Sequence, residues 1–88
     1  MDITNQKEIV KIIADISGFD EAEITPDKNF FKELDVDSIK AIEITVALEK
    51  KFNVSVRDDD VPKITTVKEA VNLVNDLLIQ KNAGHNKS

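Results

Sequence analysis

Three segments of this chain place apolar residues at the spacing of one helix face, and this repetition limits the folds open to it. In the first segment Ile9, Ile12, Ile13 and Ile16 follow the i, i+3, i+4, i+7 pattern. Similar patterns run through the middle of the chain and near its carboxyl end. We predict helices over residues 5–17, 38–52 and 67–81, each with one face against a shared core.

The ends of two of these helices carry residues that satisfy free backbone groups. Asn5 with Glu8, and Thr66 with Glu69, have the separation of a capping box. Gly18 follows the first pattern, where a helix end favours a positive φ. These signals predict that the first helix runs between Asn5 and Gly18 and that the last begins after Thr66.

The remaining segments carry few strand or turn signals. The chain has only two glycines and two prolines, which argues against an all-β fold with many tight turns. Residues 58–61 are expected to form one short helical turn before Pro62, and residues 82–88 a disordered polar tail. Residues 1–81 should therefore form one all-α domain. The long connection over residues 18–36 should pack on the helices through Phe19, Ile24, Phe30, Phe31 and Leu34.

The charge and hydropathy of the chain exclude several classes of partner. Seventeen acidic residues against twelve basic ones give a formal net charge of −5, and such a surface repels nucleic-acid phosphates. No stretch has the roughly 20 apolar residues that span a bilayer. The first residues, MDITNQKEIV, lack the basic and apolar regions of a signal peptide. We expect a cytoplasmic monomer with no nucleic-acid partner and no membrane insertion.

Side chains suited to catalysis or metal binding are scarce. The chain has no cysteine or tyrosine, and its single histidine, His85, lies in the polar tail. A nucleophile paired with a base is therefore hard to assemble, and disulfides and thiolate metal sites are excluded. The acidic run 58–60 and the pair Asp35 and Asp37 lack the alternating ligands of a calcium loop. We expect neither an enzyme nor a metal site.

The middle helix has two apolar stripes. They consist of Ala41, Ile44, Leu48 and Phe52, and of Ile39, Ile42 and Val46. One apolar stripe is enough for a helix to pack in a bundle, so the second stripe requires an explanation. Two interpretations are possible. Either neighbouring elements bury both stripes, as amphipathic patterns usually indicate, or the second stripe is an exposed docking surface edged by Glu43 and Glu49.

Ser38 stands at the predicted start of this helix, directly after Asp37, which is a suitable N-cap residue. Most such pairs are only caps. A hydroxyl in the first turn nevertheless points outward, where free N–H groups and the helix dipole stabilise an anion. A phosphodiester on Ser38 would suit that field. Asp37 could help to bind the Mg²⁺ that accompanies a pyrophosphate-bearing donor.

Residues 34–52, LDVDSIKAIEITVALEKKF, resemble the phosphopantetheine-attachment region of acyl carrier proteins, with the Asp-Ser-hydrophobic triplet at Asp37, Ser38 and Ile39. The segments ITPDKNFFKELDVDS and VPKITTVKEAVNLV resemble the family's loop before the serine and its link into the last helix. The resemblance covers residues 9–78. It implies an acyl-carrier-like four-helix bundle with a long first loop and a short third helix.

The resemblance also implies a function. A phosphopantetheinyl transferase would move 4'-phosphopantetheine from coenzyme A onto the Ser38 hydroxyl, with Asp37 as its neighbour in the motif. The arm would carry acyl intermediates as thioesters to acyl-loading and acyl-processing synthase enzymes, in fatty-acid, lipid or polyketide-type biosynthesis. The residues at the family's partner-facing positions are Ile39, Lys40, Ile42, Glu43, Val46 and Glu49.

Several departures from the family pattern bear on cargo and partners. Asp35 stands where the family usually has glycine, and Lys40 where fatty-acid carriers usually have an acid. Lys50 and Lys51 make the helix end basic, and the string DSIKAIE is closer to carriers of peptide and polyketide assembly. Two alternatives remain: a peptidyl or aminoacyl carrier with the same arm, and an interaction module of this fold that never receives the arm.

Overall fold

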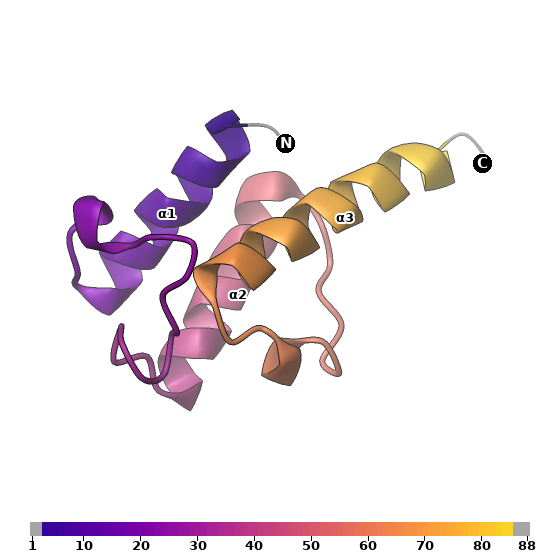
Figure 1. The fold of residues 1–88 in the computed structure, drawn as a ribbon. Helices are drawn as coiled ribbons and strands as arrows, with labels where there is room; N and C mark the ends of the chain where they lie inside the picture. The colour runs from indigo at the N-terminus through magenta and orange to yellow at the C-terminus, as the bar shows by residue number, and fades with distance from the viewer. Residues whose placement is uncertain (1–2, 86–88) are drawn as a thin grey trace.

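The protein is built from helices joined by two long irregular segments (Figure 1). The computed structural model describes the backbone of residues 3–85 and the side chains of residues 5–81. These residues contain no strand, only an isolated antiparallel bridge between Asn29 and Thr66. The predicted all-α class is confirmed. In chain order the helices and 3₁₀ turns are α1 (Ile3–Ser17), η1 (Glu21–Glu23), α2 (Ser38–Phe52), η2 (Val61–Lys63) and α3 (Val67–His85).

The core lies where the three helices and the segment between α1 and α2 meet. In Figure 1, α2 passes behind α3, while the distal part of α3 extends beyond the other helices. Burial of one such aliphatic or aromatic side chain contributes about 1.5–3 kcal/mol. The buried apolar residues are Ile9, Ile13, Ile24, Phe30, Leu34, Val36, Ile44, Leu48, Val67, Ala70, Val71 and Val74.

Two predicted helix ends are confirmed. Gly18 has a φ of 85°, and its N–H donates to the carbonyl of Ala14 at 2.9 Å. At the start of α3, the N–H of Glu69 donates to Thr66 Oγ1 at 3.2 Å, and the N–H of Thr66 donates to Glu69 Oε1 at 3.0 Å. These reciprocal bonds satisfy backbone groups that a helix start would otherwise leave free.

The predicted start of the first helix at residue 5 is wrong. The helix begins at Ile3, so Asn5 lies inside its first turn and is not the cap. An N-cap residue has a non-helical backbone, whereas Ile3, Thr4 and Asn5 are all helical here.

The predicted short helix over residues 58–61 is also wrong. Residues 58–60 form a turn, and η2 covers Val61–Lys63 instead. Pro62 has no N–H to donate to the carbonyl of Asp58, and its ring disfavours the α conformation at Val61. Residues 3–85 therefore contain three α-helices, and the four-helix count implied by the family resemblance is not confirmed.

The predicted polar tail begins too early. The structure continues α3 to His85, so residues 82–85 are helical rather than disordered. No proline interrupts this stretch, and α3 continues through Asn82 and Gly84, residue types that often end a helix. Residues 86–88 of the predicted tail lie outside the described residues.

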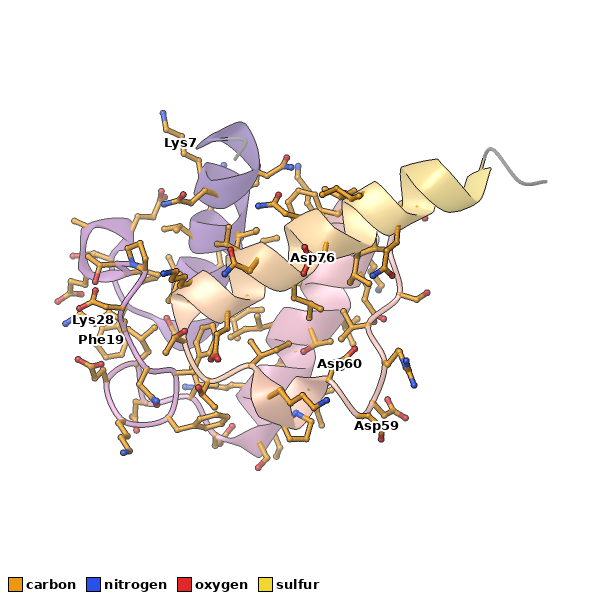
Figure 2. All side chains as sticks on the ribbon, turned by 45° about the vertical axis from the view of Figure 1, so that its right-hand side comes forward. Lys7, Phe19, Lys28, Asp59, Asp60 and Asp76 are labelled. Atoms are coloured by element: carbon orange, nitrogen blue, oxygen red, sulfur yellow. The ribbon has the colours of Figure 1, made fainter. Side chains whose placement is uncertain are left out.

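The segment between α1 and α2 is tied to the start of α3 by backbone hydrogen bonds. The N–H of Phe30 donates to the carbonyl of Thr65 at 2.9 Å, and the N–H of Val67 donates to the carbonyl of Lys28 at 3.1 Å. Figure 2 shows Lys28 and Phe19 at one edge of the molecule, and Asp59 at the opposite edge, on the segment between α2 and α3. The segment before α2 is therefore an ordered part of the fold.

Within the described residues 3–85, the helices are too short or too polar to cross a membrane. Residues 5–81, whose side chains the structure describes, contain no group of three or more Asp or Glu side chains placed to hold a metal ion.

Candidate functional site

Ser38 is the first residue of α2, and its side chain is exposed. The preceding residue, Asp37, is the N-cap, with extended backbone at φ −91° and ψ −177°. Its Oδ1 accepts from the N–H of Lys40 at 2.8 Å, and its carbonyl accepts from the N–H of Ala41 at 2.9 Å. The N–H groups of Ser38 and Ile39 precede the first intrahelical bond and can face an anion.

The chain reaches Ser38 through a sharp turn that is anchored on the core. The N–H of Val36 donates to the carbonyl of Phe30 at 2.8 Å, and both side chains are buried. Between them Asp35 takes a φ of 54°, the left-handed conformation that glycine adopts most easily. Asp35 therefore keeps the backbone conformation that glycine would favour at this position, and aspartate tolerates it better than most residues.

The second apolar stripe of α2 is exposed. Ile39, Ile42 and Val46 are 70%, 58% and 41% accessible, whereas Ile44 and Leu48 of the first stripe are buried. We call Ile39, Ile42 and Val46 the α2 strip. The interpretation that neighbouring elements bury both stripes is therefore wrong. The strip starts beside Ser38 and leaves apolar area open to a partner.

The polar residues predicted to face partners lie in three different environments. Glu43 is exposed and Lys40 is half-buried. Glu49 is also half-buried, and its Oε2 accepts from the backbone N–H of Val56 at 2.7 Å. Glu49 therefore holds the chain that leaves α2, a role that its place on the helix surface did not indicate.

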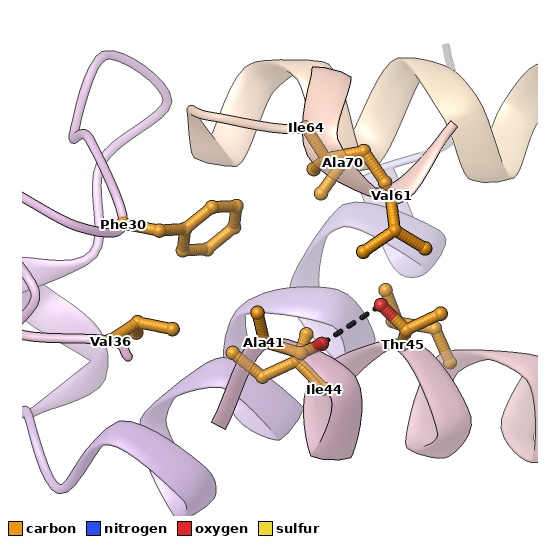
Figure 3. Close-up of a pocket in the computed structure, with 9 residues that line it drawn as sticks. Phe30, Val36, Ala41, Ile44, Thr45, Val61, Ile64 and Ala70 are labelled. Atoms are coloured by element: carbon orange, nitrogen blue, oxygen red, sulfur yellow. Dashed lines mark hydrogen bonds between the residues drawn. The ribbon is translucent and has the colours of Figure 1, made fainter. Parts of the chain in front are cut away.

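An apolar cavity lies inside the bundle, beneath residues 41–48 of α2 (Figure 3). Its volume is about 20 Å³, room for about one water molecule. The hydroxyl of Thr45 faces this space but is satisfied by the carbonyl of Ala41, at 2.9 Å. The lining residues are Phe30, Val36, Ala41, Ile44, Thr45, Leu48, Val61, Ile64 and Ala70.

Phe31 is a surface residue that sequence reasoning missed. It was expected to pack on the helices with Phe30, but it is 45% exposed while Phe30 is buried. Two adjacent aromatic residues in an irregular segment carry no periodicity, so the sequence offers no signal for which one faces inward.

Known proteins resemble this chain over most of its length. The family described as the phosphopantetheine attachment site matches residues 7–74. An acyl carrier protein of Thermobifida fusca is 39% identical over 74 residues, covering 80% of this chain and 94% of the relative. One from Petrotoga mobilis is 39% identical over 72 residues, with coverage of 82% and 85%.

A solved structure supports the same assignment at the level of the fold. It is the solution structure of the apo doublet acyl carrier protein from prodigiosin biosynthesis, with a TM-score of 0.73 and 25% sequence identity. The match covers 83% of this chain and 35% of the doublet chain.

Together these findings define a small helical carrier domain to which 4'-phosphopantetheine is covalently attached. The chain belongs to the acyl carrier protein family. Proteins of this family are carriers rather than catalysts, and they act with a phosphopantetheinyl transferase and with synthase and processing enzymes.

Proposed function

We propose that Ser38 is the residue that carries the phosphopantetheine arm. Its hydroxyl is exposed on the first turn of α2, where an attached phosphate would face free N–H groups and the positive end of the helix dipole. Asp37 already caps the N–H of Lys40, so the arm's phosphate need not replace that bond. The exposed hydroxyl at a capped helix start is the observation that carries this proposal.

Attachment at Ser38 requires one bond to form and one to break. The hydroxyl oxygen of Ser38 bonds to the phosphorus that links the arm to the nucleotide part of coenzyme A. The bond between that phosphate and the nucleotide breaks, and the serine proton passes to a base of the transferase. Once attached, the arm supplies a thiol that this cysteine-free chain lacks, and this thiol holds cargo as a thioester.

Partner enzymes would bind the α2 strip and the charged residues beside it. The exposed apolar area of Ile39 and Ile42 supports a small hydrophobic contact, and the exposed Glu43 supports attraction to basic surfaces. Such contacts release quickly, as a shuttle requires, since exposed ion pairs contribute only about 0.2–1 kcal/mol each. Lys40 would repel some enzymes and select others.

The cargo is proposed to be an acyl chain from fatty-acid, lipid or polyketide-type biosynthesis. The apolar lining of the cavity under α2 supports this, because each methylene removed from water contributes about 0.8 kcal/mol. A polar aminoacyl cargo would gain nothing there. The cavity is smaller than an acyl chain, so entry would require the elements that line it to move apart. The cytoplasmic location stays a prediction from the sequence.

Intact mass spectrometry with a matched control tests the attachment site. The chain is incubated with coenzyme A and a phosphopantetheinyl transferase, beside Ser38→Ala and Ser55→Ala. Ser55 is another exposed serine, in the segment after α2. The unaltered chain and Ser55→Ala should gain one arm, and Ser38→Ala none. An arm on Ser38→Ala, or none on the unaltered chain, would contradict the proposal.

A loading experiment separates acyl from aminoacyl cargo. The arm-bearing protein is offered to acyl-activating and aminoacyl-activating enzymes, and the covalently loaded species is identified by mass. Selective loading by aminoacyl-activating enzymes would favour the peptidyl carrier alternative, since the DSIKAIE segment resembles carriers of both peptide and polyketide assembly.

A further inference from the structure

The segment before α2 displays an aromatic side chain that the fold leaves uncovered. Phe31 is 45% exposed, while its neighbours Phe30 and Leu34 are buried in the core. Exposed apolar side chains are common singly, so exposure alone does not indicate a site. Two further observations indicate that Phe31 contacts a partner: its backbone is fixed by hydrogen bonds, and it lies within a limited distance of Ser38.

The turn that bears Phe31 is braced from both sides. Asn29 Oδ1 accepts from the N–H of Phe31 at 2.9 Å and from the N–H of Lys32 at 3.0 Å. Glu33 Oε1 accepts from the N–H of Asn29 at 2.9 Å, and the N–H of Glu33 donates back to the carbonyl of Asn29 at 2.9 Å. The ring is therefore held at the surface by an ordered backbone, so a partner that covers it has little conformational entropy to remove.

The backbone limits how far Phe31 can lie from Ser38. The hydrogen bond between the carbonyl of Phe30 and the N–H of Val36 brings the two ends of this turn together at 2.8 Å. Val36 is two residues before Ser38, so standard backbone dimensions limit the distance between the Cα atoms of Phe31 and Ser38 to about 15 Å.

An enzyme that acts on the hydroxyl of Ser38 must cover the surface around it. A standard interface buries about 800 Å² on each partner, which corresponds to a disc of about 16 Å radius. If that disc is centred on Ser38, Phe31 falls within it. Enzymes that act at the far end of the arm need not bind around Ser38, because the length of the arm separates their active sites from the start of α2.

We propose that Phe31 is an apolar anchor of the surface that the phosphopantetheinyl transferase covers. This inference rests on the proposed attachment at Ser38 and names a further residue of that interaction. The exposed Asp35 follows on the same turn, and the chain is acidic overall. The matching enzyme surface is an apolar hollow with Lys or Arg at its rim.

The rate of arm transfer, measured on the full apo chain, tests this proposal. A purified phosphopantetheinyl transferase and coenzyme A are used with Phe31→Ala, Phe31→Leu and Ile79→Ala. Ile79 is the matched control because it is 66% exposed and lies twelve residues after Val67, about 18 Å along α3. Urea unfolding and circular dichroism show whether each variant keeps the fold, and Phe31→Gln replaces Phe31→Ala if that variant unfolds.

Truncating an aromatic anchor should lower kcat/KM roughly tenfold, mainly through KM, and Leu should restore much of the loss. Ile79→Ala should stay within about twofold of the unaltered chain. The loss at Phe31 should persist at high salt, because an apolar contact is not screened. Rates within about twofold for Phe31→Ala would overturn this inference while leaving attachment at Ser38 intact. Failure of the unaltered chain to gain an arm would overturn both.

Discussion

The carboxylate of Glu49 accepts a hydrogen bond of 2.7 Å from the backbone N–H of Val56, seven residues further along the chain. The carbonyl of Glu49 also accepts from the N–H groups of Asn53 and Val54, the first two residues after α2. One residue thus ends the helix and directs the chain that leaves it. The segment that leads to η2, and so to one wall of the cavity, starts from this contact.

Glu49→Ala should destabilise the protein. A hydrogen bond to a charged acceptor contributes more than a neutral one, so we expect a loss of about 1–2 kcal/mol in the free energy of unfolding, measured in urea. Glu49→Gln keeps an acceptor and should lose less. Glu43→Ala is the control, because Glu43 is exposed, and its stability should stay within about 0.5 kcal/mol of the unaltered chain. Equal stability of Glu49→Ala and Glu43→Ala would contradict the structural role of Glu49.

Substitutions at Asp35 should depend on the left-handed backbone of that residue. Its φ of 54° disfavours β-branched side chains, so Asp35→Val should lower the free energy of unfolding by about 1–2 kcal/mol. Asp35→Gly removes that strain but raises the conformational entropy of the unfolded chain. The two effects on the free energy of unfolding should nearly cancel. Thermal or urea unfolding of both variants checks this. A tolerated valine would show that the turn adopts another conformation in solution.

Acid should weaken the start of α3 through Glu69. The hydroxyl and the backbone N–H of Thr65 donate to this carboxylate and lower its pKa from the ordinary value of 4.5. A carboxylate with a lower pKa in the folded state stabilises the fold fully above its unfolded pKa. That contribution is lost as the pH falls through the folded pKa. The free energy of unfolding should therefore decline in acid.

Glu69→Gln tests this assignment. Its free energy of unfolding should vary less with pH below the ordinary pKa of glutamate. Thr65→Val removes only the hydroxyl and should move the pKa of Glu69 back toward its ordinary value, as an NMR titration would detect. The pKa of Asp27 is also lowered, through the hydroxyl of Thr25 at 2.6 Å, so some acid sensitivity should remain in both variants. An unchanged pH profile in Glu69→Gln would exclude Glu69 as a source.

Acyl cargo should stabilise the loaded protein if it enters the cavity under α2. Lengthening a saturated chain should then raise Tm stepwise, because each buried methylene contributes up to about 0.8 kcal/mol. Ala70→Val narrows the cavity and should reduce that increment, whereas Ile79→Ala, at a residue that does not line the cavity, should leave it unchanged. A Tm independent of chain length would show that the cargo stays outside.

Much of the fold was predictable because local chemistry decides it. The three apolar patterns, the φ of Gly18 and the Thr66–Glu69 capping box depend on neighbours within one or two turns, and the structure has them as expected. The first residue of α2 follows from the same kind of signal at Asp37. The position of Ser38 at the start of α2 can therefore be predicted from a short stretch of sequence.

The exposed surfaces were less predictable because they depend on distant parts of the chain. The α2 strip has the periodicity of a buried stripe, yet its three residues are exposed in the fold. Likewise, Glu49 bonds to a backbone N–H whose position depends on the irregular segment after α2. Periodicity describes a face of a helix but does not say what covers that face.

The bridge between Asn29 and Thr66 has a consequence for when Ser38 becomes a substrate. Ser38 lies between the two bridged residues in the chain, so the segment before it gains these backbone partners only when the start of α3 has packed against it. Joining such distant residues costs loop-closure entropy that only the finished domain can offset. We expect the transferase to modify an unfolded chain poorly, so that addition of the arm would report that this domain has folded.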